Sequence, residues 1–115
     1  FFQSPEMKMV DLSFAGRQGD RHVVHNAIAQ AQVGAPIGLS MVGDRWQIED
    51  AQGRVLGRMS KAFAPPIGTK FVTGEIAAII HWRKEDAGEH FQHLLKRASW
   101  EVVVPELIFE ETKEV

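Results

Sequence analysis

The chain has 115 residues, of which 44% are hydrophobic and 24% charged, and it contains no cysteine. These values fit one globular domain whose core needs no disulfide framework. The net charge of −2 argues against a polybasic arm. The chain has no apolar run of about 20 residues, which argues against a membrane-spanning helix. The first five residues lack the basic and apolar regions of a signal peptide, so we expect a cytoplasmic protein with no membrane partner.

The first third of the chain predicts one strand and one helix. Weak alternation over residues 8–14 indicates the strand. Residues 21–33 have apolar side chains at the i, i+3, i+4, i+7 spacing of a helix: Val24, Ala27, Ile28 and Ala31. Asp20 is the expected N-cap and Gly34 the expected stop. The alternative is a short strand at 22–24 followed by a loop.

A β-hairpin over residues 45–59 is the clearest local pattern, and a strand at 37–42 precedes it. In its first strand Trp46 and Ile48 alternate with polar residues, and the turn has the sequence Asp50-Ala51-Gln52-Gly53. Strict alternation in the second strand places three residues on one face: Arg54, Leu56 and Arg58.

Residues 60–67 contain two prolines, which exclude a regular ladder there. Residues 71–82 predict one long strand with a bulge or bend at Gly74. Within it, residues 76–80 are apolar at both odd and even positions. We therefore expect both faces of this strand to be covered, one of them by the next helix.

That helix is expected over residues 84–97, with Ala87, Phe91, Leu94 and Leu95 on its apolar face. A last strand follows at 100–104, and Pro105 either breaks the ladder or marks a sheet edge.

This order of elements predicts a mainly β (α+β) fold: a small closed or partly open β-barrel with one or two packed helices. One domain covers residues 1–110, with 1–35 either part of the barrel or a peripheral strand and helix, and 111–115 form a frayed acidic tail. Small barrels of this kind usually bind a partner instead of transforming it.

Catalytic and metal-binding patterns are weak. His22 and His25, like His90 and His93, have helical spacing but no evident third ligand, so we expect no metal. No serine lies in a nucleophile elbow, and Gly68-Thr69-Lys70 lacks the upstream glycine of a phosphate-binding loop. The pattern predicts a non-enzyme without a cofactor.

Charge is distributed unevenly. Residues 54–97 hold eight cations against four acids, whereas the tail from Glu101 holds five acids and one lysine. A basic face suggests a polyanionic partner, although such charges also simply solvate a surface. The candidate nucleic-acid-binding residues are Arg54, Arg58, Lys61, Lys70, Trp82, Arg83 and Lys84. Trp82 or Phe63 would stack on bases, and core packing is the alternative role for both.

Four segments between Gly38 and Phe109 carry a family resemblance: Trp46-Gln47-Ile48-Glu49-Asp50, Gly53-Arg54-Val55-Leu56-Gly57-Arg58-Met59-Ser60, Trp82-Arg83-Lys84-Glu85-Asp86 and Trp100-Glu101-Val102-Val103-Val104-Pro105-Glu106-Leu107. In them the chain resembles the C-terminal accessory domain of some bacterial RecQ-type ATP-dependent DNA helicases. The strand, the glycine turn and the Val55-Leu56-Gly57-Arg58 segment are also similar, more weakly, to the HIRAN module, a small β-barrel attached to helicase-like proteins.

The resemblance implies a non-catalytic appendage of a longer protein whose ATP-driven motor lies elsewhere, in agreement with a chain that starts with Phe1. It implies a bacterial, nucleoid-associated location and weak binding to single-stranded or branched DNA, with contacts to other domains of the parent helicase. The alternative is a docking module without nucleic-acid contact, in which the strand at 100–104 and the edge near Pro105 matter more than the arginines.

Overall fold

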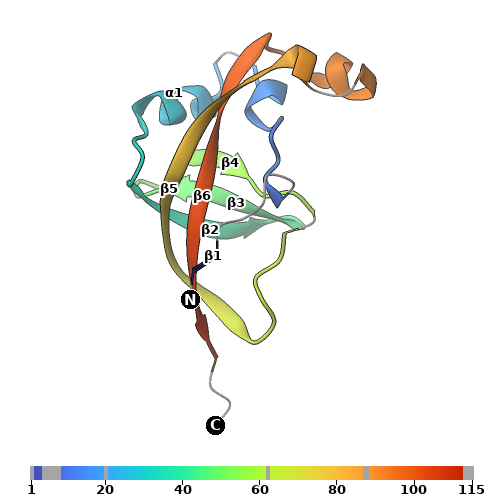
Figure 1. The fold of residues 1–115 in the computed structure, drawn as a ribbon. Coiled ribbons are helices and arrows are strands. Elements are labelled where there is room, and N and C mark those ends of the chain that lie inside the picture. The colour runs from blue at the N-terminus through green and yellow to red at the C-terminus, as the bar shows by residue number, and fades with distance from the viewer. Residues whose placement is uncertain (1, 4–8, 20, 62, 87–88, 113–115) are drawn as a thin grey trace.

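The computed structural model describes residues 2–3, 9–19, 21–61, 63–86 and 89–112, and its chain folds into one antiparallel sheet with strand order β1-β6-β5-β2-β3-β4 (Figure 1). The strands are β1 (Phe2–Gln3), β2 (Pro36–Val42), β3 (Arg45–Asp50), β4 (Val55–Arg58), β5 (Thr69–Arg83) and β6 (Ser99–Glu111). The helical segments are α1 (Val23–Gln30) and the 3₁₀ turns η2 (Ala15–Arg17), η3 (Lys84–Asp86) and η4 (Glu89–Leu94).

The sheet forms a half-barrel that is open, so a fully closed barrel is not what the chain builds. The long β5 and β6 cross over β2, β3 and β4 (Figure 1), and β2 reaches β5 only where Pro36 and Ile37 face Glu75 and Gly74. At the other edge, β4 does not return to the long strands. Instead Val10 forms an isolated antiparallel β-bridge with Met59 at this edge.

The long strand β5 bends around Gly74, as its glycine predicts. A Cβ there would lie 2.7 Å from the Glu106 carbonyl oxygen, so only glycine allows β6 to approach this closely. The register against β6 shifts on either side of this point, between Phe71 and Thr73 and between Ile76 and Ala78. The two irregularities let one strand curve along the half-barrel.

The hairpin β3–β4 and its turn are confirmed, but the predicted facing of β4 is wrong. The register places Ile48 opposite Gly57 and Glu49 opposite Val55, which leaves Leu56 as the extra residue of a bulge. Leu56 is therefore buried in the core, while Arg58 lies in a half-exposed ion pair.

The first helix is confirmed as α1, with Val24, Ala27 and Ile28 buried. The Nδ1 of His22 caps it by accepting a hydrogen bond from the N–H of Val24 at 3.0 Å. The expected cap, Asp20, lies outside the described residues.

The second helix differs from the expectation, because residues 84–97 contain the two 3₁₀ turns η3 and η4 instead of one α-helix. Of its expected apolar face, Leu95 is buried but Leu94 is 49% exposed. Ala87 and the side chain of Phe91 lie outside what the structure describes. The exposure of Leu94 removes part of the burial that would stabilise a full α-helix here.

The expected cover of β5 by that helix is also wrong, since Ala77 is exposed and residues 78–80 are only half-buried. Pro105 does not break the ladder: it is buried opposite Ile76, while the described pairing of β1 with β6 covers only Leu107 and Ile108. Of the tail expected to fray at 111–115, Glu111 ends β6 and the N–H of Thr112 donates to the Gly68 carbonyl oxygen, while 113–115 lie outside the described residues. No helix among the residues described could cross a membrane.

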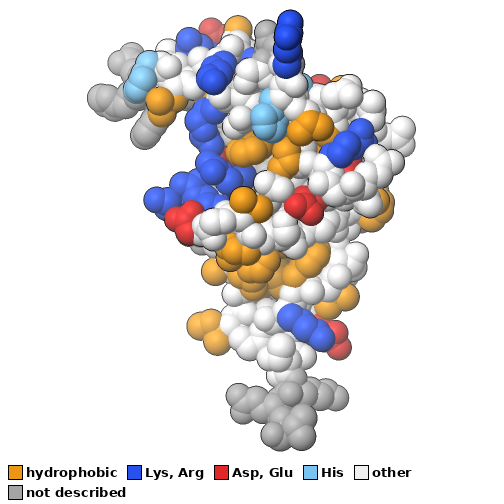
Figure 2. All heavy atoms as spheres, turned by 180° about the vertical axis from the view of Figure 1, so that it is seen from behind, with side chains coloured by type: hydrophobic (Ala, Val, Ile, Leu, Met, Phe, Trp, Pro, Cys, Tyr) orange, Lys and Arg blue, Asp and Glu red, His pale blue; other side chains and the backbone are white. Residues whose placement is uncertain are grey.

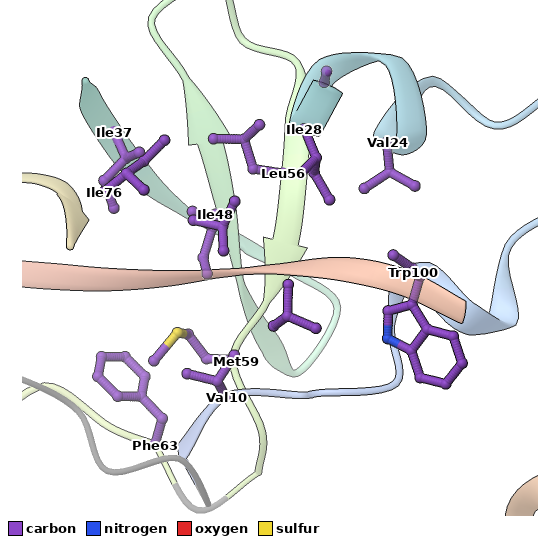
Figure 3. Packing of buried hydrophobic residues seen from close by; sticks show 14 of the residues in the cluster. Val10, Val24, Ile28, Ile37, Ile48, Leu56, Met59, Phe63, Ile76 and Trp100 are labelled. Atoms are coloured by element: carbon purple, nitrogen blue, oxygen red, sulfur yellow. The ribbon is translucent and has the colours of Figure 1, made fainter. Parts of the chain in front are cut away.

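The predicted strand at 8–14 is replaced by a different structure, the segment from Val10 to Arg17, which we call the strap. Val10 bridges to Met59, and η2 follows at the end of the strap. Figure 3 shows Val10 beside Met59 in the core, and Trp100 of β6 nearby. Thus the N-terminal segment spans from β4 to β6 and completes the hydrophobic core of the half-barrel.

Candidate nucleic-acid interface

The strap is held to the half-barrel at both ends. On the β4 side, the N–H of Asp11 donates to the Arg58 carbonyl oxygen at 2.9 Å. On the β6 side, the Trp100 Nε1–H donates to the Leu12 carbonyl oxygen at 2.7 Å. Gly16 lies so close to the indole that a Cβ would come within 2.6 Å of it. These contacts determine where the side chains of the strap project.

Asp11 is the centre of a group of three arginines. Its carboxylate accepts two hydrogen bonds from the guanidinium of Arg17, one of them at 3.2 Å from Nη1 to Oδ1. Arg58 donates to Oδ2 from Nε at 3.1 Å and from Nη2 at 2.8 Å. The Nη1 of Arg45 lies 3.6 Å from the same Oδ2. We call Arg17, Arg45 and Arg58 the arginine cluster.

The three arginines come from separate parts of the fold: η2, the first residue of β3 and the last residue of β4. Their side chains are between 22% and 31% exposed, whereas that of Asp11 is only 10% exposed. The carboxylate therefore lies inside the group and the guanidinium groups border the solvent.

Arg45 differs from the other two members of the cluster. Its distance of 3.6 Å to Asp11 is too long for a hydrogen bond. Its side chain donates no hydrogen bond to any of the residues that the structure describes. At 22% exposure its side chain is also the least accessible of the three. A half-buried arginine whose five N–H donors meet no acceptor among the described residues is ready to bind an anion.

The electrostatics keep Asp11 ionised. Burial by itself would raise the pKa of its carboxyl, but the hydrogen bonds and positive charges of Arg17 and Arg58 outweigh burial and hold the pKa below its ordinary value. Three cations and one anion leave the cluster with two positive charges in excess. This excess is local, since the whole chain carries −2.

The surroundings of the cluster are basic and aromatic. The guanidinium carbon of Arg58 lies 5.4 Å from the centre of the Phe14 ring, a cation–π contact that fixes the arginine from its other side. The backbone N–H of Lys96 donates to the Gly16 carbonyl oxygen at 2.8 Å, which brings this exposed lysine next to the strap. Figure 2 shows lysine and arginine side chains gathered along one side of the molecule.

Arg54 is separate from this cluster, although sequence spacing suggested that it accompanies Arg58. It donates to Asp50 at 2.8 Å and to the side-chain oxygen of Gln30 in α1, also at 2.8 Å. Asp50 also caps the hairpin turn by accepting from the N–H of Gln52. Burial would raise the pKa of Asp50, but the hydrogen bonds from Arg54 and Gln52 lower it. Arg54 thus has a structural role in holding the hairpin against α1.

A small cavity of about 230 Å³ lies beside this ion pair, between α1 and the hairpin. Its lining combines small apolar residues such as Ala27 and Ala31 with Gln30, Asp50 and Arg54.

The remaining predicted residues are spread over the molecule. Lys70 and Arg83 lie at opposite ends of β5, about 40 Å apart along an extended strand. Arg83 has Glu85 at 4.0 Å, and Lys84 follows in η3. Lys61 is exposed and lies three residues beyond Arg58. These cations therefore do not form one continuous track.

The two candidate stacking residues also differ in accessibility. Phe63 is 5% exposed and belongs to the core beside Met59 (Figure 3), so it cannot stack on a base in this structure. Trp82 is half-buried and lies opposite Trp100 in the β5–β6 pair.

Sequence reasoning missed three of the four central residues: Asp11, Arg17 and Arg45. Asp11 and Arg17 lie in an irregular segment, where no periodicity indicates which side chains meet. Arg45 occupies a polar position of a half-buried strand, which looks like an ordinary solvent-facing residue. The path of the strap brings Asp11 and Arg17 to Arg58, and the pairing of β3 with β4 brings Arg45 there.

In the part of the chain that the structure describes, no three His, Asp or Glu side chains gather as metal ligands. The comparisons with known proteins found no match to any family model, curated protein or solved structure. The case for function therefore depends on the geometry of the chain itself.

Proposed function

We propose that this chain is a non-catalytic DNA-binding module, an accessory domain of a helicase or repair protein that holds single-stranded or branched DNA weakly. The observation that carries the proposal is the arginine cluster, in which one buried carboxylate organises three guanidinium groups and leaves an excess of two positive charges. Phosphate groups provide most of the affinity in such complexes, and arginine binds them in two-pronged geometry.

The proposal places the centre of the interface at the arginine cluster instead of at the residues that the sequence predicted. Arg58 belongs to both, and the exposed Lys61 and Lys96 flank it along the chain or through the strap. The other predicted cations, Lys70 at the far end of β5 above all, would contribute little to the same contact. A short track of this kind fits weak binding, because few phosphates are neutralised.

The test is fluorescence anisotropy of a labelled single strand and a labelled duplex, titrated at low and moderate salt. We expect binding in the micromolar range that weakens as salt rises. The double variant Arg45→Gln/Arg58→Gln should weaken binding and flatten the salt dependence. The matched control is Lys70→Gln, which removes one exposed cation far from the cluster and should bind as the parent does.

Equal binding by the double variant and the parent, with both folded by circular dichroism, would show that the cluster is not the interface. Failure of both labelled DNAs to bind would instead favour the second candidate, docking against another domain of the parent protein.

That second candidate is favoured by a specific observation. Large apolar side chains on β2, on β5 and in the turn before β5 are at least half exposed: Met41, Val42, Ile67 and Val72. Figure 2 shows hydrophobic side chains together on the surface below the basic ones. Apolar surface of this kind often contacts a protein partner. Because a docking module of this type needs no contact with DNA, the DNA titration separates the two candidates.

A further inference from the structure

We infer that the arginine cluster is a site for a phosphomonoester dianion, and that Arg45 is the residue that distinguishes this group from a phosphodiester. The inference rests on the proposed function, because it names the chemical group that the same arginines prefer. It starts from the two features that a general basic patch does not have: convergence on one point and an arginine without an acceptor.

Convergence is shown by the distances to one atom. Donors of Arg17, Arg45 and Arg58 all lie within 3.6 Å of the Asp11 Oδ2 oxygen, although they come from three different segments. An anion placed at the solvent side of these guanidinium groups therefore meets all three at once. A groove that follows a nucleic-acid backbone would instead space its cations along the chain of phosphates.

Arg45 supplies the donors that such an anion would use. Arg17 and Arg58 each direct two donors to Asp11, whereas Arg45 hydrogen-bonds to none of the described residues. The Arg45 side chain is only 22% exposed, so its donors have limited access to solvent. A phosphate oxygen beside Arg45 would satisfy these donors.

The charge indicates which phosphate is preferred. With Asp11 ionised, the cluster carries two excess positive charges, and a phosphomonoester carries between one and a half and two negative charges near pH 7. A phosphodiester carries only one negative charge and has two of its four oxygens blocked by ester bonds. The compact cluster therefore matches the monoester in charge and in the number of free oxygens.

Two sources supply this group: the terminal phosphate of a nucleic-acid strand, or a small free phosphomonoester such as a mononucleotide. The first arm of the test compares labelled single strands of one sequence that end in a 5′-phosphate, a 3′-phosphate or only hydroxyl groups. We expect one of the phosphorylated strands to bind about fivefold to tenfold more tightly than the hydroxyl strand at equal salt.

The second arm needs no DNA. Phenyl phosphate, a dianion, and dimethyl phosphate, a monoanion, are titrated at constant ionic strength while the arginine Nε–H signals are followed by NMR. We expect phenyl phosphate to move the Arg45 signal at lower concentration than dimethyl phosphate. Arg45→Gln should remove the preference in both arms, and Lys70→Gln should keep it.

A pH series adds a readout that follows the charge of the phosphate itself. A phosphomonoester takes up its second proton near pH 6, so the preference should shrink between pH 7.5 and pH 5. Other groups near the cluster are Asp11, which stays ionised over this range, exposed Asp44 next to Arg45, and His22 at the edge of the Phe14 ring. His22→Asn removes the nearest imidazole and keeps a good helix cap, so the pH effect should persist in this variant.

The outcomes are separable. Preference for a phosphorylated strand supports the inference with a strand as the source. Preference for phenyl phosphate without any effect of the terminal phosphate supports it with a free phosphomonoester as the source. Equal response to both small phosphates, and to all three strands, overturns the inference, yet the proposed function stands if those strands bind in a salt-dependent manner. Failure of every strand to bind overturns the proposed function, and the NMR arm then decides the inference alone.

Discussion

Replacing Asp11 with asparagine removes the negative charge at the centre of the arginine cluster while keeping the size of the side chain. The carboxylate accepts two hydrogen bonds each from Arg17 and Arg58. Exposed ion pairs contribute about 0.2–1 kcal/mol, and buried hydrogen bonds to charged groups about 1.5–3 kcal/mol. These arginines are nearly one-third exposed, so about 1 kcal/mol for each is a reasonable value.

We therefore expect Asp11→Asn to lower the free energy of unfolding by about 2 kcal/mol at pH 7, or the melting temperature by about 8 °C. Urea denaturation followed by tryptophan fluorescence measures the loss. The control is Asp44→Asn, since Asp44 is exposed and forms no ion pair within the described residues; its stability should match that of the parent.

The pH dependence has a definite sign. The folded protein holds the pKa of Asp11 below the ordinary value of 3.8, so its charge stabilises the fold above that pH. This contribution is lost as the pH falls through the folded pKa, and the gap between parent and Asp11→Asn should close below about pH 4. A gap under 0.5 kcal/mol at pH 7, or one that is equally large at pH 3, would refute the reasoning, because the carboxylate charge would not be its cause.

Two glycine substitutions test the close approaches that shape the half-barrel. Gly16→Ala places a Cβ within 2.6 Å of the buried Trp100 indole and should cost about 1–3 kcal/mol, with a change in the tryptophan fluorescence. Gly74→Ala places a Cβ 2.7 Å from the Glu106 carbonyl oxygen, where backbone must move, and should cost about 2 kcal/mol or more in urea denaturation. Gly38→Ala, with no atom within 4 Å of its Cβ, should leave stability unchanged or slightly higher; equal losses at all three positions would contradict the packing argument.

The path of the strap explains why the side chains of the candidate site have fixed positions. Asp11 and Arg17 are positioned by backbone hydrogen bonds to β4 and by the indole of Trp100, not by their own ion pairs alone. Weakening the strap through Gly16→Ala should therefore also weaken anion binding. This links the stability of the half-barrel to the function proposed for its surface.

The sequence by itself determined the parts of the fold whose residues interact with near neighbours in the chain. Alternation over residues 45–50 and the glycine turn at Gly53 identified the hairpin, since a strand with one buried face has a period of two. The apolar stripe of α1 was equally visible, because helical neighbours are three and four residues apart. The mainly β character and the long strand β5 follow from the same local patterns, whereas β6 continues through Pro105 to Glu111, beyond the strand expected at 100–104.

Only the tertiary structure decided the features that depend on distant contacts. The bulge at Leu56 broke the expected alternation of β4 and placed Leu56 in the core, because a single extra residue cannot be read from a period of two. Residues 84–97 contain two 3₁₀ turns instead of the expected helix, and in the described part of its apolar face Leu94 is exposed. The arginine cluster joins Asp11 to a residue 47 positions away, through a strap without any periodic pattern. No local rule specifies such a meeting, since it arises from how the strap packs on Trp100 and pairs with β4.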